Sequence, residues 1–167
     1  MTCLDIGAST GGFTDCLLQY GAAKVYSVDV GYGQFDWTLR QNLRVKVIER
    51  TNIRQLPYEV INEKMDIIVA DTSFISLKVV IPSAEKFMRD HTLVLALIKP
   101  QFEAGKQNVG KGGVVKDPEI RKLVIKDLKV FFKERGYLVN QIVPSPIFGP
   151  KGNKEYIISL NYRENLN

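Results

Sequence analysis

Three side chains that could do acid–base chemistry stand next to predicted strands. Asp71 comes directly after the apolar run of residues 65–70, and Lys99 directly after the run of residues 92–98. Glu155 opens the last predicted strand. Because the carboxyl ends of parallel strands meet at one edge of a sheet, we expect Asp71 and Lys99 to lie together over a crevice, with Glu155 beside them. Such a cluster can be catalytic, whereas a surface ion pair of the same residues would contribute little stability.

A turn of small residues follows the first apolar run, residues 3–6. Gly7, Gly11 and Gly12 lack a Cβ, so the backbone can bend sharply and a ligand can approach it closely. The helix predicted from Gly12 would direct its free N–H groups toward that ligand. An open α/β sheet binds nucleotide-like cofactors at this place, although a capped turn without a ligand is the alternative. The candidate cofactor residues of this stretch are Asp5, Gly7, Ala8, Ser9, Thr10, Gly11, Gly12 and Phe13.

The glycine spacing indicates which cofactor to expect. Gly7-x-x-x-Gly11-Gly12 does not match the G-x-G-x-x-G pattern of dinucleotide sites. It suits a ligand with a ribose and an amino-acid tail, which is S-adenosylmethionine. Asp29 lies about twenty residues beyond the turn, where a carboxylate can accept hydrogen bonds from both ribose hydroxyls.

Length and composition indicate one globular domain over residues 1–167, with 45% apolar and 25% charged residues. The net charge of +5 is compatible with an anionic partner such as RNA. Cys3 and Cys16 show no metal-ligand spacing, so we expect no metal and two free thiols in a reducing cytoplasm. No apolar run approaches the length of a membrane span, so we expect no membrane partner.

Apolar runs alternate with helical patterns through five strands, and two further strands close the chain. This order predicts a doubly wound, Rossmann-like α/β sheet, mostly parallel, with an antiparallel strand near the C-terminus. A helix over residues 77–89 contains Pro82, which should bend it or mark its first turn. A helix capped by Asp117 is expected to bury Ile120, Leu123, Val124, Leu128 and Phe131. The predicted strands are residues 3–6, 24–29, 45–49, 65–70, 92–98, 138–143 and 155–161.

A polar, glycine-rich loop is predicted over residues 104–116. It contains the pattern G-x-x-x-x-G-K, but Gly112 replaces the Ser or Thr of a phosphate-binding loop and no helix follows directly. We therefore expect a mobile loop rather than a nucleotide site. Lys106, Lys111 and Lys116 could contact RNA phosphates, or simply be solvated.

Four blocks of sequence together resemble one family. They are residues 5–15 (DIGASTGGFTD), 71–77 (DTSFISL), 97–103 (LIKPQFE) and 110–115 (GKGGVV). They are similar to the TlyA (hemolysin A) family of S-adenosylmethionine-dependent ribosomal RNA 2′-O-methyltransferases, related to the FtsJ group. The resemblance implies a methyltransferase sheet, a cytoplasmic enzyme, and ribosomal RNA or a ribosomal subunit as partner.

The resemblance also implies a catalytic set Lys-Asp-Lys-Glu, whose last three members match Asp71, Lys99 and Glu155. In the family the first lysine and a small RNA-binding domain precede the cofactor strand. Neither occurs in this sequence, and Met1 abuts the first core strand, so we expect a chain truncated at its start. Lys99 would be the base for a ribose 2′-hydroxyl if burial or a second lysine lowers its pKa below about 10.4. Asp71 and Glu155 would orient the lysines.

The remaining roles concern the cofactor and the competing functions. Asp29 would hold the cofactor ribose, Asn52 and Ile53 would border the adenine, and Asp71 would also contact the cofactor. The family name suggests a membrane-acting haemolysin, but no spanning segment or basic amphipathic helix supports it. An RNA-binding module without catalysis and a methyltransferase of base amino groups are two more hypotheses, although Asp71-Thr72-Ser73-Phe74 lacks the two prolines typical of the latter.

Overall fold

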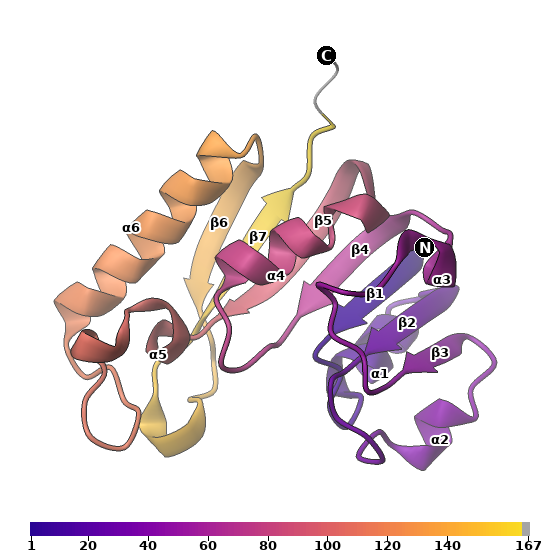
Figure 1. The fold of residues 1–167 in the computed structure, drawn as a ribbon, viewed down its shortest axis with the longest axis horizontal. Coiled ribbons are helices and arrows are strands. Elements are labelled where there is room, and N and C mark those ends of the chain that lie inside the picture. Colours follow the sequence, from indigo (N-terminus) through magenta and orange to yellow (C-terminus); the bar gives the residue numbers. More distant parts are fainter. Residues whose placement is uncertain (165–167) are drawn as a thin grey trace.

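The computed structural model describes residues 1–164, and within them the chain forms one seven-stranded sheet with the order β3-β2-β1-β4-β5-β7-β6 (Figure 1). Strand β7 is antiparallel to both of its neighbours, and the other neighbouring pairs are parallel. The predicted doubly wound sheet is therefore confirmed. The strands are β1 (Thr2–Ile6), β2 (Lys24–Val28), β3 (Val45–Ile48), β4 (Met65–Ala70), β5 (Met88–Ile98), β6 (Leu138–Pro144) and β7 (Tyr156–Asn161).

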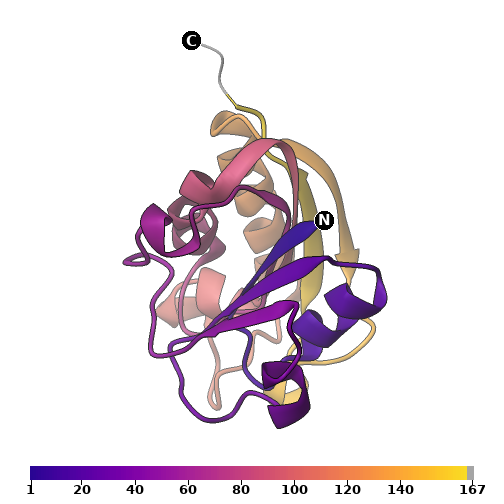
Figure 2. The same ribbon diagram turned by 90° about the vertical axis from the view of Figure 1, so that its right-hand side faces the viewer.

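Helices lie on both faces of the sheet, with α1 on one face and α4 and α6 on the other (Figure 2). The α-helices are α1 (Gly12–Gln19), α2 (Trp37–Arg40), α3 (Tyr58–Ile61), α4 (Leu77–Ser83), α5 (Pro100–Glu103) and α6 (Pro118–Glu134). Three 3-10 turns are η1 (Glu85–Phe87), η2 (Lys106–Asn108) and η3 (Pro150–Gly152). Over residues 1–164, none of the helices has the length and apolar character needed to cross a membrane.

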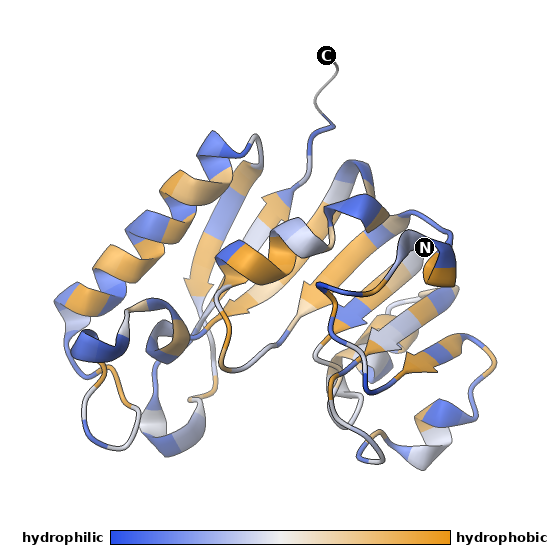
Figure 3. Ribbon diagram, viewed as in Figure 1, coloured by the Kyte–Doolittle hydropathy of each residue, from blue (hydrophilic) through white to orange (hydrophobic). Residues whose placement is uncertain are grey.

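Two apolar clusters fill the two faces of the sheet because side chains alternate along each strand. Leu4 and Tyr26 pack into the larger cluster with α4 and α6, whereas Cys3 and Val25 pack with α1. The central strands are accordingly hydrophobic along most of their length (Figure 3). This double-sided burial accounts for the continuous apolar runs from which the strands were predicted.

Helix α6 begins where the sequence predicts, because the Asp117 carboxylate accepts a hydrogen bond of 2.8 Å from the Glu119 N–H and Pro118 occupies the first helical position. Its buried stripe differs from the prediction. Leu123 is 59% exposed, Ile120 and Phe131 are only half-buried, and Arg121 and Phe132 are buried instead. The stripe consists of Arg121, Val124, Leu128 and Phe132, since these positions share the sheet-facing side of the helix.

The predicted helix over residues 77–89 is wrong in its second half. Helix α4 ends at Ser83, directly after Pro82, and β5 already begins at Met88. Strand pairing shifts there, since Met65 pairs with Met88 but Ile67 pairs with Leu93. The extra residues of β5, including the exposed polar Arg89 and His91, lie within this shift of register, which explains why the sequence did not indicate a strand.

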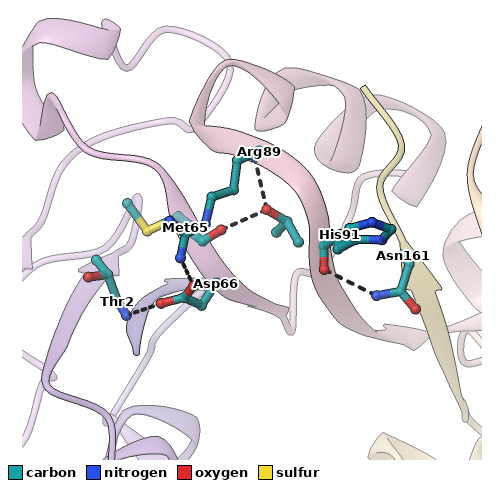
Figure 4. Close-up of polar contacts among 7 residues, drawn as sticks. Thr2, Met65, Asp66, Arg89, His91 and Asn161 are labelled. Carbon is teal, nitrogen blue, oxygen red and sulfur yellow. Dashed lines mark hydrogen bonds and ion pairs between the residues drawn. The ribbon is translucent and has the colours of Figure 1, made fainter. Parts of the chain in front are cut away.

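Side chains at this bulge hold β4 and β5 together (Figure 4). The Arg89 N–H donates to Thr92 Oγ1, and that hydroxyl donates to the Met65 carbonyl at 2.6 Å. Asp66 pairs with the Arg89 guanidinium and accepts from the Thr2 N–H. The bulge is thus anchored at the end of the sheet opposite to the strand ends that carry the candidate site.

The corrected stripe of α6 gives a test with a matched control. Leu128→Ala should lower the free energy of unfolding by about 2–5 kcal/mol, because it leaves a cavity between α6 and the sheet. Leu123→Ala, the same change on the exposed side, should cost less than about 1 kcal/mol. Urea unfolding followed by circular dichroism measures both. Equal losses for the two variants would contradict the observed orientation of the helix.

Candidate active site

The carboxyl ends of β1, β2 and β4 surround a cavity of about 640 Å³. Six of the predicted cofactor residues line it: Gly7, Ser9, Asp29, Asn52, Ile53 and Asp71. The segment after β4 also contributes Thr72, Ser73 and Phe74, which sequence reasoning did not assign to the cofactor. These three residues could have been predicted from their position directly after Asp71, because residues that follow the end of a strand lie at the same edge of the sheet.

The other predicted cofactor residues lie outside this cavity lining. They are Asp5, Ala8, Thr10, Gly11, Gly12 and Phe13. Ala8 and Gly11 are buried in the turn itself, and Gly12 opens α1. The sequence places the whole turn at the cofactor, whereas the structure brings only Gly7 and Ser9 of this stretch to the cavity wall.

Gly7 is required by the packing of the turn. Its backbone has a φ of +81°, in the left-handed region that glycine favours, and its N–H donates to the Val28 carbonyl at 2.8 Å. A Cβ at this position would overlap the backbone carbonyl of Asp71. Glycine therefore lets the first turn and the segment after β4 approach each other at the cavity.

Asp29 is fixed at the rim of the cavity by two backbone donors. Its Oδ2 accepts from the Ser9 N–H at 2.7 Å and its Oδ1 from the Gly31 N–H at 2.6 Å. Each carboxylate oxygen can accept more than one hydrogen bond. Asp29 is therefore oriented, with acceptor capacity left for hydroxyl groups of a ligand.

Asp5 lies beneath the turn, where it serves the structure of the protein. The residue is fully buried, and its Oδ2 accepts from the Thr14 hydroxyl at 2.7 Å, which in turn bonds Ser27 Oγ at 2.7 Å. The pKa of Asp5 is raised to about 6, mainly by burial; the Thr14 hydrogen bonds oppose this rise, and the nearby carboxylates of Asp71 and Asp29 add to it. Asp5 thus ties the start of α1 to β1 from below.

Asp71 and Lys99 lie together, as the sequence predicts. Lys99 Nζ is 2.6 Å from Asp71 Oδ1 and donates to Ser73 Oγ at 3.1 Å. The Lys99 side chain is only 13% exposed, so this ion pair is partly shielded from water. Since Asp71 also lines the cavity, the ammonium stands at the edge of the space that a cofactor would occupy.

Glu155 is adjacent to this pair in the sheet. Ile98 pairs with Tyr156 across the antiparallel strands, so Lys99 and Glu155 come next in the same register. The Glu155 carboxylate is buried and accepts from Gln101 Nε2 at 3.0 Å. Its hydrogen-bond partner is therefore Gln101, which sequence reasoning missed, and β7 itself begins one residue later than predicted.

The segments after β4 and β5 are joined at two further places. Glu103 accepts from the Ser76 hydroxyl at 2.6 Å and from the Leu77 N–H at 2.7 Å, and burial raises the pKa of Glu103. The rings of Phe74 and Phe102 lie 4.9 Å apart between their centroids. These contacts hold Asp71 and Lys99 at a fixed separation.

The loop with Lys106, Lys111 and Lys116, for which the sequence predicts mobility, forms hydrogen bonds within itself and to α6. Its backbone forms a bridge between Gly110 and Val114, and the buried Arg121 guanidinium donates to the carbonyls of Val115 and Lys116. The three lysines are exposed and do not line the large cavity. A contact of these lysines with RNA stays a prediction.

Known proteins share this sequence and fold. The family model of the FtsJ-like methyltransferases matches residues 1–162. The chain is 48% identical to the 16S/23S rRNA (cytidine-2′-O)-methyltransferase TlyA of Mycobacterium tuberculosis, over 95% of this chain and 59% of the relative. It is 45% identical to Hemolysin A of Brachyspira hyodysenteriae, over 93% of this chain and 65% of the relative.

A solved structure described as "Putative hemolysin from Streptococcus thermophilus" superposes with a TM-score of 0.94 and 41% identity. The match covers 98% of this chain and 60% of the solved one. The chain therefore spans about three-fifths of the length of the first of these relatives.

Two glycines of the turn give a matched pair of variants. Gly7→Ala should lower the free energy of unfolding by about 1–3 kcal/mol, because the new methyl group meets the Asp71 carbonyl at a positive φ. Gly12→Ala should be tolerated, since a Cβ there has no neighbour within 4 Å. Thermal unfolding of the two variants measures the difference. A Gly7→Ala protein as stable as the Gly12→Ala protein would refute the close approach.

Asp5 predicts a pH dependence of stability. Its pKa in the folded state, about 6, lies above the unfolded value near 3.8, so its contribution to stability is full below about pH 4 and is lost as the pH rises through 6. Asp5→Asn does not titrate and still offers an oxygen to Thr14. The variant should therefore gain stability over the parent protein by about 1–3 kcal/mol between pH 4 and pH 7. Urea unfolding at several pH values measures this, and parallel stability profiles would contradict it.

Proposed function

We propose that this chain, which belongs to the FtsJ-like methyltransferase family, binds S-adenosylmethionine in the cavity at β1, β2 and β4 and transfers its methyl group to a ribose 2′-hydroxyl of ribosomal RNA. The observation that carries the proposal is the pair of Asp71 and Lys99. Asp71 lines the cavity and at the same time contacts the half-buried ammonium. The pair thus stands between a cofactor in the cavity and a substrate on the other side of Lys99.

The residues around the cavity suit S-adenosylmethionine. A volume of about 640 Å³ is appropriate for a ligand of that size. The oriented Asp29 carboxylate would hold the ribose hydroxyls, and Asn52 with the buried Ile53 would border the adenine. Among residues 1–164 the buried Thr72 hydroxyl at the cavity wall has no hydrogen-bond partner, so a polar ligand would satisfy it.

The chemical step that we assign to the protein's own residues is removal of the proton from the ribose 2′-hydroxyl. When bound, S-adenosylmethionine supplies an electrophilic methyl group on a sulfonium. A ribose 2′-hydroxyl attacks well only as its proton leaves, and Lys99 Nζ is the group we assign to accept that proton. Asp71 and Ser73 hold Nζ in place, and Glu155, held by Gln101, would orient the substrate side of the site.

A lysine accepts a proton only as a neutral amine, so Lys99 must release its own proton before the transfer. Positioning supplies much of the rest of the rate enhancement, since the hydroxyl must face the methyl group in line. The half-buried place of Nζ and its two contacts would reduce the motion of the base during transfer.

The substrate assignment rests on two supports. The Mycobacterium tuberculosis relative, and a further relative from Campylobacter jejuni that is 37% identical, are named rRNA (cytidine-2′-O)-methyltransferases. The exposed Lys106, Lys111 and Lys116 are suited to ribosomal RNA phosphates. We place the reaction in the cytoplasm, where ribosomal RNA is found.

Cofactor binding and methyl transfer test the proposal separately. Isothermal titration calorimetry should detect S-adenosylmethionine binding, and Asp29→Ala should weaken it at least about tenfold because the ribose acceptor is lost. In cells whose chromosomal gene carries Lys99→Ala, mass-spectrometric mapping should find the 2′-O-methyl marks on ribosomal RNA lost, since removing an acid–base group costs about 10²- to 10⁴-fold.

The matched control is Lys122→Ala, which removes an exposed lysine paired only with Glu119 on α6. It should leave the marks intact. Full methylation by the Lys99→Ala protein would remove the catalytic assignment, and failure of the parent protein to bind S-adenosylmethionine would remove the proposed function.

A further inference from the structure

Two loops beside Glu155 carry an uncompensated positive charge. Residues 104–116 and 145–154, called the paired loops below, contain five lysines and no Asp or Glu. All five are exposed, and none takes part in the ion pairs found among residues 1–164. These lysines are Lys106, Lys111, Lys116, Lys151 and Lys154. A surface of this kind attracts an extended anion.

Asn153 joins the paired loops into one unit. The residue is 3% exposed, and its side chain accepts from the Val115 N–H at 3.1 Å and donates to the Gly113 carbonyl at 2.9 Å. The stem of Lys151 lies close to Gly112, where a Cβ would be 3.8 Å from it. Asn153 is therefore a positioning residue, which holds lysines of two distant segments on one surface.

The second of the paired loops also exposes apolar side chains. Ile147 is 73% and Phe148 67% exposed, and both line a cavity of about 290 Å³ together with Lys154 and Glu155. A protein that binds single-stranded RNA combines lysines for the phosphates with exposed aromatic rings on which bases stack. Lysines alone would fit any polyanion, whereas the ring beside them favours a nucleic acid.

The place of the paired loops in the fold agrees with a substrate. The large cavity lies over β2, β1 and β4, and Lys99 follows β5 at its border. The paired loops follow α5 and connect β6 to β7, on the other side of Lys99 in the sheet order (Figure 1). A substrate that reaches Lys99 opposite the cofactor must pass over this side.

We propose that the paired loops bind the single-stranded segment of ribosomal RNA next to the methylated nucleotide, with phosphates on Lys111 and Lys151 and one base on Phe148. This inference rests on the proposed function, because it takes the RNA to be the substrate at Lys99. Asn153 does not contact the RNA and acts through the loops that it holds together.

The test compares variants of the full protein for binding to protein-free ribosomal RNA and for methyl transfer. Lys111→Gln/Lys151→Gln should raise the dissociation constant about tenfold and lower the salt dependence of binding by about 1.4 in log–log slope, for two lost phosphate contacts. Phe148→Ala should weaken binding about tenfold without changing that slope. Both should raise KM for RNA and leave kcat and the affinity for S-adenosylmethionine unchanged.

Matched controls are available on other surfaces. Lys129→Gln/Lys133→Gln removes two exposed lysines from α6, and Tyr20→Ala removes an 80% exposed ring after α1. These variants should bind RNA as the parent does. Asn153→Ala, which keeps every lysine, should also weaken RNA binding while the affinity for S-adenosylmethionine persists as proof of folding.

Two outcomes separate the claims. If the loop variants bind RNA with the parent constant and salt slope and show the parent KM, the paired loops are not the RNA surface, and the proposed function stands. If the parent protein binds no S-adenosylmethionine or leaves no ribose methylation, the proposed function is wrong, and the inference about the paired loops falls with it.

Discussion

The ion pair of Asp71 and Lys99 is the contact around which the rest of the site is arranged. Ala70 pairs with Ala96 in the parallel strands, so Asp71 follows that pair by one residue and Lys99 by three. Because of this offset, the two side chains meet only if the segments that follow β4 and β5 are fixed relative to each other. Partial burial of an ion pair costs desolvation free energy for each charge. The pair therefore needs neighbours that fix its geometry.

Those neighbours come from both sides of the pair. On the β1 side, Gly7 allows the turn to pack against the Asp71 backbone, and the Asp71 N–H donates to the Ile6 carbonyl at 2.9 Å. On the β5 side, Glu103 binds the start of α4 through Ser76 and Leu77. The pair is therefore fixed by contacts that lie outside it, and a change in either neighbour would alter the position of the two charged groups.

The sequence predicts the strand ends well because each buried strand is an apolar run with an abrupt polar end. Asp71 and Lys99 could be placed together on that basis, since parallel strands bring their carboxyl ends to one edge. Asp29, Asn52 and Ile53 were found at the cavity for the same reason. The rule fails where a strand contains exposed polar residues, as at Arg89 and His91 in β5, where the pairing with β4 shifts register.

Residues that serve distant backbone groups could not be predicted from spacing. Arginine is usually a surface residue, yet Arg121 is buried. Its guanidinium donates to the Val115 carbonyl of a loop that only the fold brings near. Asn153 holds Gly113 and Val115 across about forty residues of sequence in the same way. The predicted burial of Leu123 is wrong for a simpler reason: hydrophobic character alone does not say which side of a helix a residue occupies.

The reversed direction of β7 explains how residues so far apart in the chain share one edge. In a parallel strand the residue at the edge of the candidate site follows the strand, as Asp71 follows β4 and Lys99 follows β5. Because β7 runs antiparallel to β5, the residue at that edge must precede it, and Glu155 does. The same reversal brings the connection from β6 to the edge of the candidate site, so that the side of Lys99 away from the large cavity is built from one loop before an antiparallel strand and one loop after a parallel strand. Asn153 stands two residues before Glu155, and its hydrogen bonds join these two loops at the position where the sheet changes direction.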